Sequence, residues 1–308
     1  MLSSVRTMQG RTAVITGATS GIGLIAAKNL AAMGARIILV ARDRQRAQAT
    51  LDALRQAGPA ADHRAYFADL SLLADMKRVA SEIAAAEPRI HVLLNNAGAM
   101  FRDRQLTLER LEKTFALNHM SYFVLTFLLR DKLAAAGAAR VINVSSHAHK
   151  GNSLNFTDLQ SERSYAGFRS YGRSKLCNVL FTSELARRWA ATGITANSLH
   201  PGFVNTRFGG EAGGRKFRLA KRLFALSPQK GAETMTYLAS SQDPVVTNAN
   251  GLYFYRKKPV PPSREAQDRQ SAETLWRMSE QIAGFADPAH GHIANSHMDV
   301  TASPSFAD

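Results

Sequence analysis

Short apolar runs alternate with stretches of helical pattern along most of this chain. Such alternation is typical of repeated βαβ units, which build a parallel sheet. The first five apolar runs are rich in aliphatic and β-branched residues, as expected of strands that helices cover on both faces. The pattern therefore predicts an α/β fold with seven strands: Thr12–Thr16, Arg36–Ala41, His63–Ala68, His91–Asn95, Arg140–Ser145, Thr195–Leu199 and Leu252–Tyr255.

No internal repeat and no low-complexity linker interrupts the chain between Arg11 and Tyr255. We therefore expect one domain over residues 1–284, although 308 residues would also allow two. A C-terminal extension over 257–284 begins Pro-rich and extended and continues as an amphipathic helix over Arg264–Ala283. The last stretch, 285–308, has no Lys or Arg and scatters Gly, Pro, Ser and His, which predicts a disordered tail.

The composition excludes several classes of protein. Because Cys177 is the single cysteine, no intrachain disulfide and no cysteine-cluster metal site can form, and the scattered histidines favour no metal site. The first ten residues have no signal-peptide core, and the longest apolar run, Met120–Leu129, is about half a membrane span. We expect a cytoplasmic protein. That apolar run is either a buried helix or a homodimer interface.

A net charge of +15 predicts attraction to anionic partners. Residues 207–230 concentrate it, with seven Lys or Arg against Glu211 alone. Nucleic-acid binding is not expected, because stacking aromatics and reader motifs are lacking. The cluster is interpreted first as a solvated helix face. The alternative is a lid over an apolar pocket that makes weak contact with an anionic membrane.

Glycines follow the first predicted strand in the segment Thr16-Gly17-Ala18-Thr19-Ser20-Gly21-Ile22-Gly23. A strand that turns sharply into a helix points backbone N–H groups and the positive end of the helix dipole outward, which suits a pyrophosphate. Glycine permits the close approach that a Cβ would block. The Gly-x-x-x-Gly-x-Gly spacing thus indicates a dinucleotide site, with an ordinary glycine-rich turn as the alternative.

The end of the second predicted strand bears on the choice of cofactor. An acidic residue there would bind the 2′-hydroxyl of NAD, whereas an arginine accommodates the 2′-phosphate of NADP. The strand ends at Ala41 and is followed by Arg42, so NADP(H) is predicted and NAD remains possible. Asp43 is expected to cap the following helix.

Tyr171 and Lys175 stand four residues apart where a helical pattern begins, so they share one helix face. Moving a phenol pKa from about 10 to about 7 takes roughly 4 kcal/mol. A cation about 4 Å away supplies about that much at an effective dielectric near 20. The pair therefore predicts a tyrosine that lysine makes acidic, with an exposed helix pair as the alternative.

Five segments in this order resemble the short-chain dehydrogenase/reductase family. They are the glycine motif, Asn95-Asn96-Ala97-Gly98, Ser145-Ser146, Tyr171 with Lys175, and Pro201-Gly202. The resemblance covers residues 11 to about 255. It implies a Rossmann-type, doubly wound, parallel seven-stranded sheet with helices on both faces.

The resemblance also implies roles for particular side chains. Ser146 would hydrogen-bond the substrate oxygen, Tyr171 would exchange its proton, Lys175 would also hold the nicotinamide ribose, and Asn118 would position a water. These four are the predicted catalytic residues. The predicted cofactor residues are Gly17, Ser20, Gly21, Ile22, Gly23, Arg42, Asp69, Leu70, Asn96, Ala97, Gly98, Tyr171, Lys175, Pro201, Gly202, Val204 and Thr206.

Other spacings and segments of the chain resemble one branch of this family, the retinol dehydrogenase and protochlorophyllide reductase-like branch. They include the 25-residue step from Ser146 to Tyr171, with its insertion over 150–164, and the segment His200-Pro201-Gly202. The implied activity is NADP(H)-dependent hydride transfer with a lipophilic aldehyde, ketone or retinol-like alcohol. The substrate-binding segments would be Ala99–Arg104, His147–Ser164 and Phe203–Leu226. Alternatives are a non-catalytic NADP-binding sensor, an epimerase, or a reductase of a conjugated ring double bond.

Overall fold

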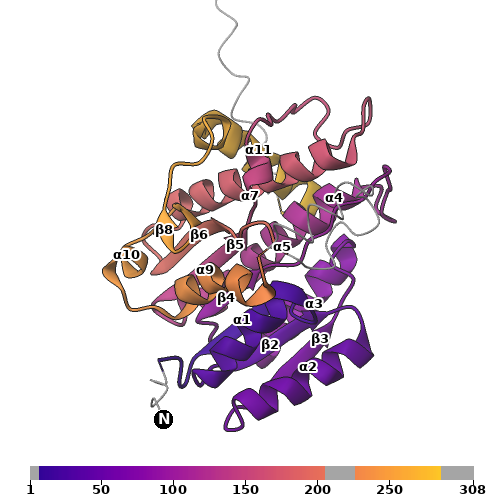
Figure 1. Cartoon of the computed structure of the whole chain (residues 1–308). Helices are drawn as coiled ribbons and strands as arrows, with labels where there is room; N and C mark the ends of the chain where they lie inside the picture. The colour runs from indigo at the N-terminus through magenta and orange to yellow at the C-terminus, as the bar shows by residue number, and fades with distance from the viewer. Residues whose placement is uncertain (1–6, 205–225, 286–308) are drawn as a thin grey trace, which may run out of the picture.

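One twisted sheet organises the computed structural model, which describes residues 7–204 and 226–285 (Figure 1). Its strands lie in the order β3-β2-β1-β4-β5-β6-β7-β8. The chain runs outward from β1 to β3 and then returns to place β4 on the other side of β1, which is the crossover of a doubly wound sheet. The strands are β1 (Thr12–Thr16), β2 (Arg36–Ala41), β3 (Arg64–Phe67), β4 (Val92–Asn95), β5 (Ala139–Val144), β6 (Ile194–His200), β7 (Tyr253–Tyr255) and β8 (Lys258–Pro259).

The predicted fold class is confirmed, with one addition. Each of the seven predicted strands is present with boundaries that differ by at most one residue, and all seven pair in parallel. The eighth strand, β8, is a two-residue edge strand that pairs antiparallel with β7. It was missed because two residues of the Pro-rich extension carry no alternation that a sequence pattern can detect.

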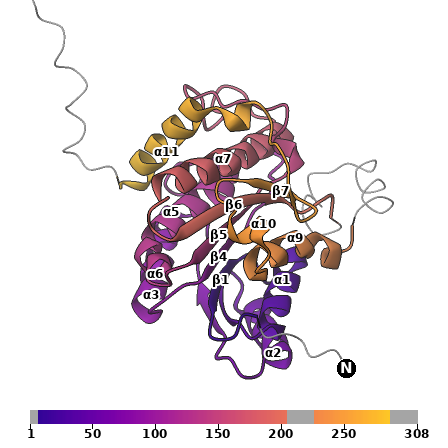
Figure 2. The ribbon, with the colours of Figure 1, turned by 90° about the vertical axis from the view of Figure 1, so that its left-hand side faces the viewer.

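Helices cover both faces of the sheet (Figure 2). One face packs against α1, α2 and α9, and the other against α3, α5 and α7. In the described ranges, no helix is both long and apolar enough to cross a lipid bilayer. The helices are α1 (Gly21–Ala32), α2 (Arg44–Ala57), α3 (Leu73–Ala86), α4 (Lys113–Phe115), α5 (Ser121–Leu128), α6 (Arg130–Ala134), α7 (Gly167–Arg188), α9 (Pro228–Ser240), α10 (Pro244–Thr247) and α11 (Arg269–Ala283).

Strand residues alternate between two apolar cores. Val14 and Ile38 face the core shared with α3, α5 and α7, whereas Ile15 and Leu39 face the core shared with α1, α2 and α9. Because side chains of a strand point alternately to opposite faces, a strand buried on both sides needs apolar residues on both faces. This requirement is why the strands were recognisable from the sequence.

The C-terminal helix α11 lies across α7 and α5 (Figure 2). Asp268 caps its start by accepting a hydrogen bond from the Ser271 N–H, and Gly284 ends it with a φ of 65°. Trp276 packs edge-on against Phe123 at 5.2 Å between ring centroids. The extension therefore completes the core on this face. From residue 286 on, the predicted tail lies outside the described residues.

Candidate active site

The glycine turn between β1 and α1 is fitted closely against the end of β4. A Cβ added at Gly17 would lie 2.8 Å from the Ala97 Cα, and one at Gly23 would lie 2.5 Å from Asn96 Nδ2. Asn96 Nδ2 donates to the Thr16 carbonyl at 2.9 Å and to the Gly17 carbonyl at 3.1 Å. The Asn-Asn-Ala-Gly segment thus holds the shape of the glycine turn.

The N-terminus of α1 opens beside this turn. Ser20 is its N-cap but makes no side-chain capping hydrogen bond, and the first helical turn, which includes Gly21 and Ile22, carries no acidic residue. Such a terminus presents N–H groups and the positive end of the helix dipole. These residues fit the pyrophosphate of a dinucleotide, which would supply the missing acceptors.

Arg42 and Asp69 follow the ends of β2 and β3. The Arg42 side chain is 76% exposed, and its Nη1 lies 3.7 Å from Asp69 Oδ2. Asp43 Oδ1 accepts from the Arg46 N–H at 2.9 Å, which makes Asp43 the N-cap of α2, as expected. The next residue after Asp69, Leu70, is buried. Because Asp43 is engaged by the helix, the exposed guanidinium of Arg42, paired only at 3.7 Å with Asp69, is the charged group next to the end of β2 that could meet a ligand.

The helix α7 holds Tyr171 and Lys175 against the end of β5. The Lys175 Nζ donates to the Val144 carbonyl at 3.0 Å and lies 5.6 Å from the centre of the Tyr171 ring. Ser146 follows β5, and its side chain hydrogen-bonds the Tyr171 hydroxyl. Ser145 donates its hydroxyl to the Lys175 carbonyl at 2.7 Å. The structure therefore brings Ser146, Tyr171 and Lys175 together.

Asn118 joins the same cluster from a π-helical segment, Ala116–Met120. Its Oδ1 accepts from the Ala99 N–H at 2.8 Å, and its Nδ2 donates to the Ala99 carbonyl at 2.9 Å and to Ser174 Oγ at 2.9 Å. A Cβ at Gly98 would lie 3.1 Å from Asn118 Oδ1 and 3.3 Å from Lys175 Nζ. All four predicted catalytic residues thus converge at the carboxyl ends of β4 and β5.

Burial sets the protonation of the central pair. It raises the pKa of Tyr171 to about 12, while the hydrogen bond with Ser146 acts in the opposite direction. Burial also lowers the pKa of Lys175 to about 7. The prediction that Lys175 makes Tyr171 acidic is wrong for this structure, because burial, which disfavours the charged phenolate, has the largest effect on the Tyr171 pKa. With its pKa raised in this way, the Tyr171 hydroxyl keeps its proton at neutral pH.

The loop after β6 lies beside the N-terminus of α1. Gly202 adopts a φ of 92°, and a Cβ there would lie 2.5 Å from the Leu226 side chain. A Cβ at Gly231 would lie 2.6 Å from Val204 and 2.7 Å from Ile22. Pro201, Gly202 and Val204 thus border the same edge. Thr206, most of the charged 207–230 segment and most of the predicted lid lie outside the described residues.

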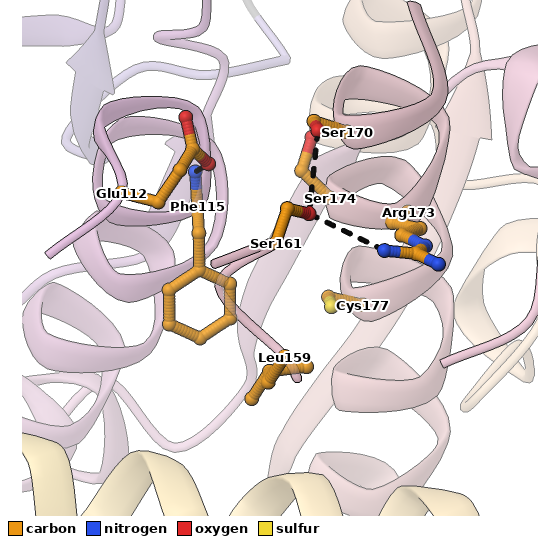
Figure 3. Close-up of a pocket in the computed structure, with 8 residues that line it drawn as sticks. All are labelled: Glu112, Phe115, Leu159, Ser161, Ser170, Arg173, Ser174 and Cys177. Carbon is orange, nitrogen blue, oxygen red and sulfur yellow. Dashed lines mark hydrogen bonds between the residues drawn. The ribbon is translucent and has the colours of Figure 1, made fainter. Parts of the chain in front are cut away.

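A small cavity lies between α7 and α4 (Figure 3). Its volume of about 10 Å³ is near that needed for one water. Cys177 lines it and is itself a buried, packed residue, and this burial raises the pKa of its thiol. The other lining residues are Glu112, Phe115, Leu159, Ser161, Ser170, Arg173 and Ser174.

Several polar residues around the site had no recognisable signal in the sequence. Tyr122 and Asn178 donate to the same Val144 carbonyl as Lys175, at 3.4 and 3.3 Å. His147, which follows β5, stacks at 4.0 Å between ring centroids on His200, the last residue of β6. In the part of the chain that the structure describes, no three His, Cys, Asp or Glu residues are grouped to hold a metal ion. Only the folded chain brings these residues to one place.

The doubly wound sheet, the uncapped glycine turn and the Ser-Tyr-Lys cluster define a dinucleotide-binding oxidoreductase. The family model for short chain dehydrogenases matches residues 11–214. Mouse retinol dehydrogenase 14 is 39% identical over 293 residues, which cover 90% of this chain and 87% of the relative. Human retinol dehydrogenase 13 is 37% identical over 296 residues, with coverage of 93% and 88%.

A solved structure supports the same family assignment. It was described as an NAD(P)-dependent gluconate 5-dehydrogenase from Beutenbergia cavernae and contains NADP. It superposes with a TM-score of 0.67 at 26% identity and covers 82% of this chain and 97% of its own. This chain therefore belongs to the short-chain dehydrogenase/reductase family, in its retinol dehydrogenase-like branch. The family assignment and the enzyme class expected from the motifs are confirmed.

Proposed function

We propose that this enzyme uses NADPH to reduce the carbonyl group of a lipophilic aldehyde or ketone, and catalyses the reverse oxidation of retinol-like alcohols. The observation that carries the proposal is the grouping of the buried Tyr171, which hydrogen-bonds Ser146, with Lys175, whose Nζ lies 5.6 Å from the centre of the Tyr171 ring. A protonated phenol is the form that reduction needs, because the carbonyl oxygen must gain a proton as it becomes an alcohol.

Each catalytic residue has a separate task in this proposal. The nicotinamide, when bound, supplies the hydride. The Ser146 hydroxyl orients the substrate oxygen, and Tyr171 donates its proton to that oxygen. The ammonium of Lys175 stabilises the phenolate that remains. Asn118 fixes both backbone groups of Ala99 and thereby the loop after β4, which borders the substrate in this proposal.

A lipophilic substrate is proposed from the relatives, which are named retinol dehydrogenases. The test supplies NADPH with matched panels of long-chain aldehydes, retinal, polar sugars and compounds with a conjugated ring double bond, and identifies each product. We expect alcohols from the lipophilic carbonyls. Turnover confined to sugars, or to ring double bonds with the carbonyl intact, would refute the proposal.

A preference for NADPH over NADH is proposed from Arg42, whose guanidinium is exposed where a 2′-phosphate would sit. The NADP in the related structure supports it. The variant Arg42→Ala should bind NADPH roughly 10- to 100-fold more weakly, which corresponds to a charge-assisted bond of about 1.5–3 kcal/mol. Its affinity for NADH should change by less than about twofold, since NADH lacks the phosphate.

Fluorescence titration of both nucleotides measures this difference, with Arg46→Ala as the control. Arg46 is a neighbouring arginine that lies 3.6 Å from Asp43 in the first turn of α2. An equal loss of affinity for both nucleotides in Arg42→Ala would show that Arg42 does not read the phosphate.

The rate of carbonyl reduction should fall as the pH rises through about 7, because Lys175 then loses its proton. The ammonium below this pH favours proton donation by Tyr171, whereas the neutral amine above it does not. The Tyr171 hydroxyl stays protonated throughout this range. Measuring kcat for reduction from pH 5.5 to 9.5 at saturating NADPH tests this. A rate that climbs steadily with pH would contradict the assignment.

A further inference from the structure

Ser146 begins a single 3₁₀ turn, His147–His149, that follows β5. The backbone of Ser146 is extended, with φ −159° and ψ 155°, and its Oγ accepts from the Ala148 N–H at 3.1 Å. A hydroxyl oxygen that accepts in this way keeps its own hydrogen for another partner, here Tyr171 or a substrate oxygen. The shape of the turn therefore decides where the Ser146 hydroxyl lies.

His149 ends this turn and is fully buried. Its Nδ1 lies 2.6 Å from the Ser146 carbonyl oxygen, and its Nε2 accepts from the Ser263 N–H at 3.1 Å. Its ring meets that of Tyr253 edge-on, at 5.0 Å between centroids. The imidazole thus bridges the backbone of Ser146 and the backbone of the C-terminal extension, although Ser263 lies 114 residues after His149.

The two partners of the His149 ring have fixed roles. A carbonyl oxygen can only accept and a backbone N–H can only donate, so Nδ1 must carry the proton and Nε2 must be bare. Burial lowers the pKa of His149, so the ring is neutral at pH 7 and carries one N–H. The Nδ1–H tautomer satisfies both ring nitrogens, whereas the other tautomer would lose both buried hydrogen bonds.

The same turn is packed against α7 beside Tyr171. A Cβ at Gly172 would lie 2.6 Å from the Ala148 carbonyl oxygen and 2.4 Å from Asn152 Nδ2. Asn152 Nδ2 donates to that carbonyl at 2.8 Å. The turn therefore has two supports, the contact with α7 and the hydrogen bond from His149 to the extension. Loss of the second would let Ser146 shift relative to Tyr171.

We propose that His149 is a positioning residue for carbonyl reduction. As its Nδ1–H tautomer, it ties the Ser146 carbonyl to the Ser263 N–H and thereby holds the Ser146 hydroxyl beside Tyr171. This inference rests on the proposed function for the reaction, but the hydrogen-bonded bridge does not. His149 makes no contact with the substrate in this proposal. The C-terminal extension is accordingly part of the framework of the active site.

Kinetics of two variants test the positioning. His149→Phe keeps a planar ring beside Tyr253 but removes both hydrogen bonds, so kcat should fall roughly 10- to 100-fold, as expected for a misplacement of about 1 Å. The dissociation constant of NADPH should change by less than about threefold, because the glycine turn is distant from the change. His149→Asn places an amide N–H near the position of Nδ1–H. It should therefore recover roughly 3- to 10-fold of the lost kcat, the effect of one hydrogen bond.

The matched control is His63→Phe. His63 is also buried and also bridges two backbone groups: its Nδ1 accepts from the Ile37 N–H at 3.0 Å, and its Nε2 lies 3.1 Å from the Gly58 carbonyl oxygen. Ile37 is near the amino end of β2, whereas the active site lies at the carboxyl ends of the strands. Both Phe variants should lower the free energy of unfolding, but His63→Phe should keep kcat within about twofold of the wild type. Equal kcat values for the two Phe variants would overturn the proposal, as would a His149→Asn enzyme no faster than His149→Phe.

Nitrogen NMR of the labelled wild-type protein tests the bridge without turnover and without a variant. At pH 7 we expect a proton on Nδ1 of His149 and a bare Nε2, with a scalar coupling from Nε2 to the backbone nitrogen of Ser263 across the hydrogen bond. His63, which is held the opposite way round, should show a bare Nδ1 and serves as the internal reference. A proton on Nε2 of His149, or no coupling to Ser263, would overturn the inference. Wild-type protein that shows the coupling but reduces no carbonyl would instead refute the proposed function.

Discussion

Replacing Tyr171 with Phe should lower kcat for carbonyl reduction roughly 100- to 10,000-fold, the range expected when a general acid is removed. The change deletes only the buried hydroxyl that hydrogen-bonds Ser146. The ring, the helix α7 and the glycine turn stay in place, so the dissociation constant of NADPH should change by less than about threefold. Single-turnover kinetics and fluorescence titration separate these two effects.

The control for this variant is Tyr237→Phe. It removes the hydroxyl of a tyrosine on α9 that donates to Asp243 at 2.8 Å, outside the catalytic cluster. We expect kcat to stay within about twofold of the wild type, as for ordinary surface substitutions. If Tyr171→Phe and Tyr237→Phe turned over equally fast, Tyr171 would not be the proton donor.

Lys175→Met should abolish most activity and yet stabilise the protein. Methionine has a similar length and no charge, so it removes the ammonium that would stabilise the phenolate. In the free enzyme, burial of that amine is unfavourable, as its pKa of about 7 indicates. At about 1.4 kcal/mol for each pKa unit, relief of this cost should raise the free energy of unfolding at pH 7 by roughly 2–4 kcal/mol.

The pH dependence identifies the cause of this stabilisation. Between pH 7 and about 10 the unfolded wild type binds more protons at position 175 than the folded protein, so wild-type stability rises with pH across this window. The gain from Lys175→Met should therefore be largest below pH 7 and nearly vanish at pH 10. Urea unfolding at several pH values measures it. A variant less stable than wild type at pH 6 would show that the amine is well accommodated.

The sheet and the glycine turn were predictable because their signals are local. A strand buried on both faces carries apolar residues on both of them, and the turn before Gly21 needs glycine where a Cβ would collide. Ser146, Tyr171 and Lys175 were identified by type and order along the chain. That the three side chains would act together was implied by the resemblance to the short-chain dehydrogenase/reductase family.

Other features depend on contacts between distant segments. The Val144 carbonyl accepts hydrogen bonds from Lys175 and Asn178, which lie 31 and 34 residues later in the chain, so no local spacing predicts these contacts. The π-helical segment that places Asn118 has no distinctive residue pattern. The predicted pKa of Tyr171 had the wrong direction because a pairwise estimate of charge attraction omits the loss of water around both groups, which only the folded structure reveals.

The helix α11 also sets a limit on how this protein can be engineered. Its Trp276 and the following Phe285 cover Phe123, Phe127 and Phe181. A recombinant version cut before Arg269 would leave these aromatic rings facing solvent, and apolar patches of that kind promote aggregation. Affinity tags and fusion partners are therefore best joined beyond Phe285, where they leave this aromatic layer intact.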